Sequence, residues 1–204
     1  MSAFALITLL ALAAIAMLVM RMAKLPSTAS LSAVTSGAPQ AEVADVSDGL
    51  SYQLLSAPWR DGCPMRDSPV RWTSGEGAVA GHVVSGGHSV TWWANACSGV
   101  LPAGLQQAGL ARTAQAAAAA IDTDRALRHH RTTLSSGATR VYGHRAWVIR
   151  YQVRFSGAQL AWSSEDAAVV VVERGHGQAP AVFYVSVPDN LGSSTLTTLI
   201  SSLR

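Results

Sequence analysis

Lysine, acidic side chains and runs of basic residues are scarce or missing in this sequence. Charged residues make up 13% of the 204 residues, the formal net charge is +3, and Lys24 is the only lysine among 15 basic residues. Proteins that bind the phosphate backbone of nucleic acids carry clustered Lys and Arg. We therefore expect no nucleic acid as a partner, and we interpret the excess of arginine over lysine as the codon bias of a GC-rich bacterial genome.

Sequence signatures of catalysis, phosphate binding and metal binding are missing as well. The chain has no GxSxG and no GxxxxGK motif, and neither cysteine belongs to a CxxC pair. The neighbours His129–His130 do not share a helix face, as metal ligands at i and i+4 do. The acidic pairs in Asp122–Asp124 and Glu165–Asp166 are better explained as caps and turns than as acid–base catalysts. We expect no catalytic residue, no metal ligand and no cofactor.

A long apolar run opens the sequence. Residues 3–20 form an 18-residue run that is apolar except for Thr8 and is followed by Arg21 and Lys24. A helix of this length crosses a hydrocarbon core of about 30 Å. A cleavable signal peptide carries its positive charge before the apolar run, whereas here the charges follow it. We therefore predict a membrane anchor over residues 1–24, with a signal peptide as the alternative. Residues 25–48, rich in Ser, Thr, Ala and Pro, have the composition of a flexible linker.

The only two cysteines each lie beside turn residues, in Asp-Gly-Cys63-Pro and Ala-Cys97-Ser-Gly. Such a pair indicates one disulfide formed in an oxidising compartment, with free buried thiols as the alternative. The positive-inside rule, applied to Arg21 and Lys24, favours the opposite, cytoplasmic orientation. We give more weight to the cysteines and expect a single-pass protein of the cell membrane whose domain is extracytoplasmic.

Strand patterns begin at residue 49, where the domain is predicted to start. Residues 50–55 alternate as a strand does, and residues 78–84 and 88–96 are two strands separated by Ser85–Gly87, a hairpin signal. Residues 103–120 are rich in alanine and predict a helix, which Asp122 can cap for a continuation to Leu127.

The carboxyl-terminal half predicts more strands and a closing helix. In residues 144–156 apolar residues alternate with Arg and Gln, which is typical of a half-buried antiparallel strand. Residues 167–173 and 181–187 are apolar on both faces and predict central strands. From Ser193 a helix places one apolar stripe on the sheet, formed by Leu196, Leu199, Ile200 and Leu203. This order predicts an α+β sandwich with a mainly antiparallel sheet.

Three segments of the sequence resemble the Mog1/PsbP-like group, and in particular small actinobacterial envelope proteins of that fold. They are GLSYQLLSAPW at 49–59, VYGHRAWVIRYQV at 141–153, and VVVVERGHGQAPAVFYVSVPDN at 169–190. The resemblance covers residues 49–204 and implies an α/β/α sandwich used mostly as a binding or accessory module. It implies no functional residue, because no binding motif of the better-known members matches a position here.

Two features indicate where such a module binds. From Arg125 to Arg154 the sequence has seven arginines and, after Asp124, no Asp or Glu, which favours a positive face, with solvated arginines on the outside of a sheet as the alternative. Consecutive residues of a strand point to opposite faces, so one ring of the adjacent tryptophans enters the core and the other faces out. The predicted interaction surface consists of Trp92, Trp93, Arg145, Arg150 and Arg154.

These expectations combine into a non-enzymatic, membrane-tethered adaptor that binds another protein of the cell envelope. A carrier for a lipid or another small apolar ligand, held between sheet and helix, is the alternative. An enzyme is the third possibility.

Overall fold

A computed structural model describes residues 41–204, apart from residues 66–67, 124–126, 157–159, 176 and 193. The predicted anchor over residues 1–24 and most of the linker predicted over residues 25–48 lie outside the described residues. The last part of that linker contains strand β1 (Glu42–Asp45), which pairs with β2 (Leu50–Gln53). Strand pairing therefore begins before the predicted boundary at residue 49. Among the residues that the structure describes, no helix is long and apolar enough to cross a membrane.

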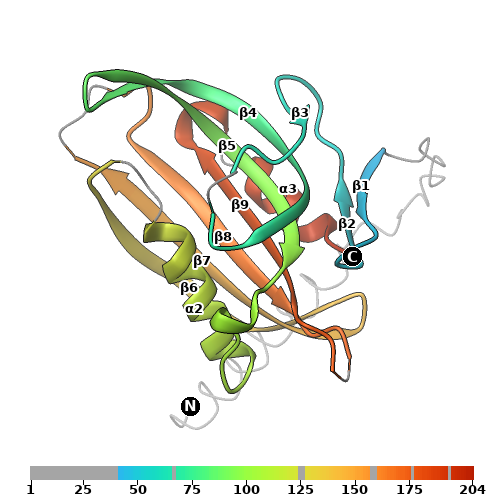
Figure 1. Cartoon of the computed structure of the whole chain (residues 1–204). Coiled ribbons are helices and arrows are strands. Elements are labelled where there is room, and N and C mark those ends of the chain that lie inside the picture. Colours follow the sequence, from blue (N-terminus) through green and yellow to red (C-terminus); the bar gives the residue numbers. More distant parts are fainter. Residues whose placement is uncertain (1–40, 66–67, 124–126, 157–159, 176, 193) are drawn as a thin grey trace, which may run out of the picture. The chain divides into compact units, whose positions relative to one another are not determined.

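The main body of the fold is a seven-stranded sheet in which every pair of neighbours is antiparallel (Figure 1). In spatial order the strands are β3 (Arg60–Asp61), β4 (Arg71–Ser85), β5 (His88–Val100), β9 (Ala181–Pro188), β8 (Ser164–Val172), β7 (His144–Phe155) and β6 (His129–Val141). Two 3-10 turns lie between these elements, η1 (Ala103–Leu105) and η2 (Asp189–Leu191). The predicted mainly antiparallel sheet is confirmed.

One helix covers each face of the sheet. Helix α2 (Leu110–Thr123) contacts β7 and β8 on the front face of Figure 1, and α3 (Ser194–Ser202) contacts β2, β8 and β9 behind it. The alternation along β8 shows why both faces are filled: Val169 and Val171 join the cluster under α2, while Ala168 and Val170 join the cluster under α3. Burying one such valine stabilises the fold by roughly 1.5–3 kcal/mol. The expected α+β class is confirmed.

The structure corrects the prediction around α2. Gly109 adopts a positive φ of 91°, which a right-handed helix does not allow, so the helix begins at Leu110 and not at residue 103. Asp122 lies inside α2 and Leu127 is not helical, while residues 124–126 of the predicted continuation lie outside the described residues. Residues 129–137, for which no strand was predicted, form the first part of β6.

The two hairpins that flank the central strands have tight turns. The predicted hairpin around Ser85–Gly87 is confirmed, with Gly86 and Gly87 at φ 57° and 82°, and its strands are longer than expected. The hairpin of β6 and β7 turns at Tyr142 and Gly143, at φ 46° and 84°. Both pairs of angles are those of the left-handed turn that matches the twist of a hairpin.

Candidate functional site

The structure divides the predicted interaction surface into two separate places. Trp92 and Trp93 lie on β5, whereas the three arginines lie on β7, and β9 and β8 separate those strands. Three strand spacings amount to roughly 14 Å. Trp92 is only 9% exposed, so it belongs to the core, while Trp93 is half-buried. The five predicted residues therefore do not form one surface.

The cysteines are joined as predicted. Cys63 and Cys97 form a disulfide with their Cα atoms 5.4 Å apart, and Cys97 is fully buried in β5. The bond holds the segment before β4 against the sheet, where the Gly62 N–H donates to Gly75 O at 2.8 Å. Gly75 is required there, because a Cβ atom on it would lie 2.8 Å from the Cβ atom of Cys63.

Trp93 is the tryptophan that faces outward. Its ring lies over Gly77, so that a Cβ atom on Gly77 would lie 3.3 Å from Trp93 Cε3, and Pro64 covers the same glycine. Trp93 lines a cavity of about 330 Å³ together with the segment 60–64. This outward ring is therefore packed against the segment that the disulfide fixes.

Trp92 instead completes a buried cluster around Glu165. The Trp92 ring packs against Trp162 and Phe155, with centroids 5.9 and 5.3 Å away. Its indole N–H donates to Glu165 Oε1, and the Ser186 hydroxyl donates to Glu165 Oε2 at 2.6 Å. Because Glu165 is a residue of β8 and only 1% exposed, its interpretation as a turn or cap residue is wrong. The signal that was missed is Ser186, a polar residue within an otherwise apolar central strand.

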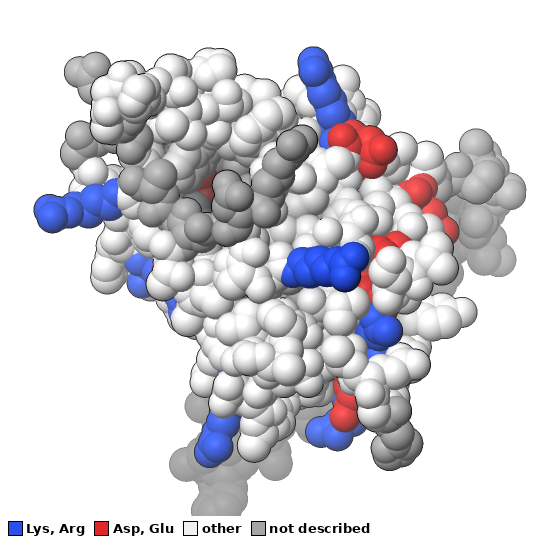
Figure 2. All heavy atoms as spheres, in the orientation of Figure 1, with Lys and Arg blue, Asp and Glu red and all other residues white. Residues whose placement is uncertain are grey.

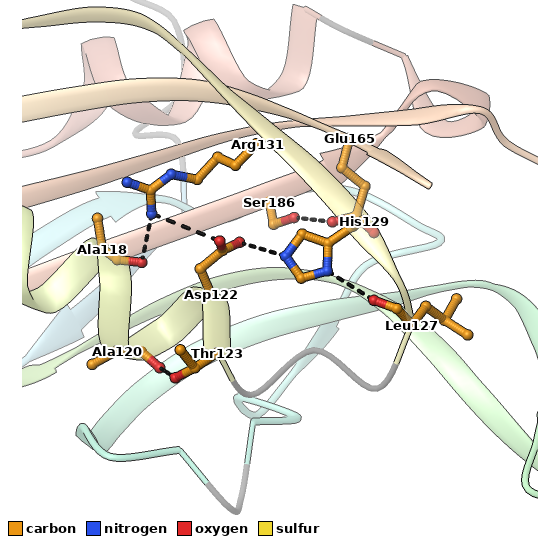
Figure 3. Close-up of polar contacts among 9 residues, drawn as sticks. All are labelled: Ala118, Ala120, Asp122, Thr123, Leu127, His129, Arg131, Glu165 and Ser186. Carbon is orange, nitrogen blue, oxygen red and sulfur yellow. Dashed lines mark hydrogen bonds and ion pairs between the residues drawn. The ribbon is translucent and has the colours of Figure 1, made fainter. Parts of the chain in front are cut away.

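A second polar group links the end of α2 to β6 (Figure 3). Asp122 Oδ1 lies 3.3 Å from His129 Nε2, and Asp122 Oδ2 lies 3.8 Å from a guanidinium nitrogen of Arg131. The same nitrogen of Arg131 donates to Ala118 O at 3.1 Å, and its guanidinium lies 4.9 Å from the centre of the Tyr151 ring. These contacts fasten the last turn of the helix to the sheet.

The arrangement in Figure 3 contains groups that some hydrolases use, but not in their geometry. A catalytic histidine holds a carboxylate with one ring nitrogen and a nucleophile with the other. Here the second nitrogen of His129, Nδ1, lies 2.8 Å from Leu127 O, and the Ser186 hydroxyl donates to Glu165. The contacts therefore support an anchoring role. Within the described part of the chain, no three His, Cys, Asp or Glu residues are grouped so as to hold a metal ion.

Buried carboxyl groups also lie beneath the β1–β2 hairpin. Burial raises the pKa of Asp45, but hydrogen bonds from Thr73, the Ser47 backbone and Ser98 together hold that pKa below its usual value. Burial, reinforced by the nearby charge of Asp45, raises the pKa of Asp48 to about 7.

Glu76 is the corresponding carboxyl group of β4. Its carboxylate accepts the Leu55 N–H at 3.1 Å, and burial raises its pKa to about 7. These carboxyl groups attach β1 and β2 to the sheet and make this attachment sensitive to pH.

The hairpin of β6 and β7 (His129–Phe155), which we call the basic hairpin, carries a large excess of positive charge. It has five arginines and no Asp or Glu, so its formal charge of +5 exceeds the +3 of the whole chain. Arg131 pairs with Asp122, and the exposed Arg145 lies 3.5 Å from Glu173. Among the described residues, no carboxylate lies within ion-pair distance of Arg140, Arg150 or Arg154.

The free arginines of β7 lie on the face away from α2. Tyr151 and Val153 pack under α2, so Arg150 and Arg154, which alternate with them, point to the opposite face. Arg154 donates to Gln152 Oε1 at 2.9 Å. On the α2 face, Figure 2 shows basic and acidic side chains scattered over a mostly uncharged surface. Arg145 has the same parity as Tyr151, so Arg145 and Arg140, which lies opposite it on β6, are on the α2 face.

Comparisons with known proteins give similarities to solved structures only. No family model matches the chain, and no curated protein matches it. The solution structure of cyanobacterial PsbP (CyanoP) from Synechocystis sp. PCC 6803 is 15% identical, covers 83% of this chain and 95% of that chain, and has a TM-score of 0.48. The crystal structure of LpqN, involved in cell envelope biogenesis of Mycobacterium tuberculosis, is 13% identical, covers 82% and 86%, and has a TM-score of 0.40.

Proposed function

We propose that the chain is a membrane-tethered, extracytoplasmic binding module that acts without catalysis as an adaptor for another protein of the cell envelope. The observation that carries the binding role is the basic hairpin, in which Arg140, Arg150 and Arg154 have no carboxylate partner among the described residues. Charges left free in this way are available to a partner, and they accelerate and orient its approach.

The location is supported by the disulfide and by the apolar run at the amino terminus. A disulfide such as Cys63–Cys97 persists in oxidising compartments and is rare in the bacterial cytoplasm. The run at residues 3–20 has the length of a membrane anchor. Together they favour a domain tethered on the outer side of the membrane.

A crosslinking pull-down of the full chain from membranes of the source organism tests the adaptor role. We expect one envelope protein to be captured by the wild type and lost when Arg140, Arg150 and Arg154 are changed to Glu. A matched variant, Arg112→Glu on the exposed side of α2, should capture it normally. Capture that is independent of all four arginines would contradict the role of the basic hairpin, and turnover of generic ester or peptide substrates would contradict the non-enzymatic role.

Thiol labelling in the same preparation tests the compartment. Protein denatured without reductant should incorporate no maleimide at Cys63 or Cys97, and reduction should expose both. Free labelling of both cysteines before reduction would remove the main support for the outward orientation.

A carrier for a small ligand is a second candidate function. It is favoured by a cavity of about 330 Å³ at the turn of the basic hairpin, where Leu50, Val141 and Val172 provide apolar walls and Arg174 a charge. The predicted place between sheet and helix is not favoured, because the fully buried Ala114, Ala117 and Ala118 of α2 bring the helix backbone close to the sheet. Native mass spectrometry of the purified chain should show a bound small molecule if this function is correct, and the bare mass would contradict it.

A further inference from the structure

Strand β6 is a long edge of the sheet. It is the last of the seven strands, it spans 13 residues, and among the residues that the structure describes it pairs only with β7. An edge strand presents a row of backbone N–H and C=O groups that a further strand can pair with. Val141 is the one buried residue of β6, so neither face of the strand is packed over most of its length.

One half of this edge is regular enough to receive another strand. The register shifts between Thr133 and Ser135, where Leu134 is 58% exposed. Beyond the shift, the seven residues Ser135–Val141 pair without interruption with β7, from Arg150 to His144. This run contains no proline. We call Ser135–Val141 the basic edge.

The charge around the basic edge selects the partner that it can accept. Arg140 lies in the edge itself with Arg145 opposite it on β7, and Arg150 lies opposite Ser135 at the other end of the edge. A second copy of the same edge would bring these like charges together, which disfavours self-pairing. An acidic strand would gain both the backbone hydrogen bonds and the opposite charge.

The turn that ends the basic edge exposes an aromatic side chain in a strained conformation. Tyr142 is 81% exposed and has a φ of 46°, a region that bulky residues rarely adopt. The other hairpin makes the same kind of turn with Gly86 and Gly87, which do so without strain. Strain of this kind persists mostly at functional positions, and an exposed tyrosine is a frequent anchor of protein interfaces.

We propose that the basic edge binds an extended acidic peptide segment of an envelope partner, which adds to β6 as a further strand and contacts Tyr142 at its end. This inference rests on the proposed adaptor function and specifies its partner. A backbone edge of seven residues distinguishes a peptide from a lipid surface, because only a peptide satisfies both the N–H and the C=O groups of the strand.

Peptide binding to the full chain in detergent tests this directly. The probe is a fluorescent nine-residue peptide of Glu and Val in alternating pairs, so that both faces of the added strand carry Glu. Its binding is measured by anisotropy, together with that of two versions N-methylated at the odd or at the even positions. Only alternate N–H groups of an added strand face the edge. We therefore expect one methylated version to bind at least tenfold more weakly and the other to bind like the parent, whereas equal binding of all three peptides would overturn the proposal.

Variants of the protein test the contributions of individual side chains with the unmethylated peptide. Arg140→Glu and Arg150→Glu should each weaken binding about tenfold, and Arg112→Glu, which changes the net charge equally, should weaken it less than threefold. Tyr142→Asn should weaken binding severalfold while making the fold more stable, an outcome that a purely structural role would not give. Equal losses in all the arginine variants would reduce the interaction to net charge and overturn the site.

Two further outcomes separate this inference from the proposed function. If Arg140→Glu and Arg150→Glu still capture an envelope protein in the pull-down, the adaptor function stands and the basic edge is wrong. If phosphatidylglycerol vesicles bind in an Arg150-dependent way while the acidic peptide does not bind, the surface recognises lipid and the proposal fails.

Discussion

The β4–β5 hairpin and the basic hairpin share a backbone design but are held in place by different side chains. Both are long and antiparallel, both contain a register shift, and both turn on two residues with positive φ. The first carries the buried Trp92, the disulfide at Cys97 and the buried Glu76, whereas the second carries five arginines and the exposed Tyr142. The side chains that distinguish the first hairpin are thus buried in the fold, whereas those that distinguish the second lie where a partner can reach them.

The largest expected effect on the free energy of unfolding comes from Trp92, and it distinguishes this residue from its neighbour Trp93 on β5. Trp92→Ala removes a ring packed on Trp162 and Phe155 and the N–H that Glu165 accepts, so we expect a loss of about 4 kcal/mol in the free energy of unfolding. Trp93→Ala, at the half-buried neighbour, should lose about 1 kcal/mol. Urea denaturation measures both, and equal losses would contradict the different burial of the two rings.

Removing the disulfide is the next largest change, and it affects the β4–β5 hairpin alone. The bond joins residues 34 apart, and in the chain-entropy model a loop of this size contributes roughly 3–4 kcal/mol. The Cys63→Ser, Cys97→Ser double variant should lose about this much in urea denaturation, while binding of the acidic peptide at the basic edge should persist in the folded protein. Loss of peptide binding at urea concentrations where the variant is folded would show that the two hairpins are coupled.

The pH dependence of stability should arise from carboxyl groups outside the basic hairpin, on β4 and beneath the β1–β2 hairpin. Asp48 and Glu76 have pKa values of about 7 in the folded state, against ordinary values of 3.8 and 4.5. The folded state therefore holds protons that the unfolded chain has released, so stability falls as the pH rises from about 4 to about 7 and is constant above. We expect the free energy of unfolding at pH 6 to exceed that at pH 8 by roughly 2.5 kcal/mol, about half from each group.

Variants test which carboxyl groups cause the pH dependence of stability. Asp48→Asn should raise stability at pH 8 and reduce the difference between pH 6 and pH 8 by about half, and Arg112→Gln should leave it unchanged. Measurements stay at pH 5 and above, because the pKa of Asp45 is lowered and its contribution is lost only at more acidic pH. An unchanged difference in Asp48→Asn would show that this carboxyl group is not the one that titrates.

The smallest expected effect compares the two turns. Tyr142→Asn places a residue that tolerates positive φ in the turn of the basic hairpin and should stabilise the fold by about 0.5–1 kcal/mol. Gly86→Tyr makes the reverse change in the other hairpin and should destabilise it by about 1 kcal/mol. Thermal unfolding checks both signs, and a destabilised Tyr142→Asn variant would show that the tyrosine ring makes a stabilising contact.

The sequence predicted the strands whose apolar residues follow a regular pattern. The alternation from Trp147 to Phe155 correctly placed β7, and the apolar runs correctly placed β8 and β9. The first half of β6 was missed, because an edge strand with both faces exposed has no apolar side that would produce a period of two. This strand, which the side-chain pattern does not predict, is the one whose backbone edge we propose as the binding site.

The candidate site was predicted only in part. The positive charge between Arg125 and Arg154 is visible in the sequence. The sequence does not show that Arg131 and Arg145 have acidic partners, whereas Arg140, Arg150 and Arg154 have none among the described residues. Glu165 was misinterpreted, because its donor Trp92 lies 73 residues away in the sequence. Local rules for turns and caps contain no information about such a contact.

By itself, the sequence determined the antiparallel strand pattern, the closing helix, the pairing of Cys63 with Cys97 and the concentration of arginine in one hairpin. These follow from local periodicity, turn residues and composition, which act within a few residues of the chain. Only the tertiary structure decided that Trp92 is the buried ring and Trp93 the outer one, that Glu165 and Asp48 are buried carboxyl groups, and that β6 is the edge strand of the sheet formed by the described residues. Those properties depend on which strands become neighbours, because burial, hydrogen-bond partners and the position of an edge in a sheet arise from contacts between distant segments.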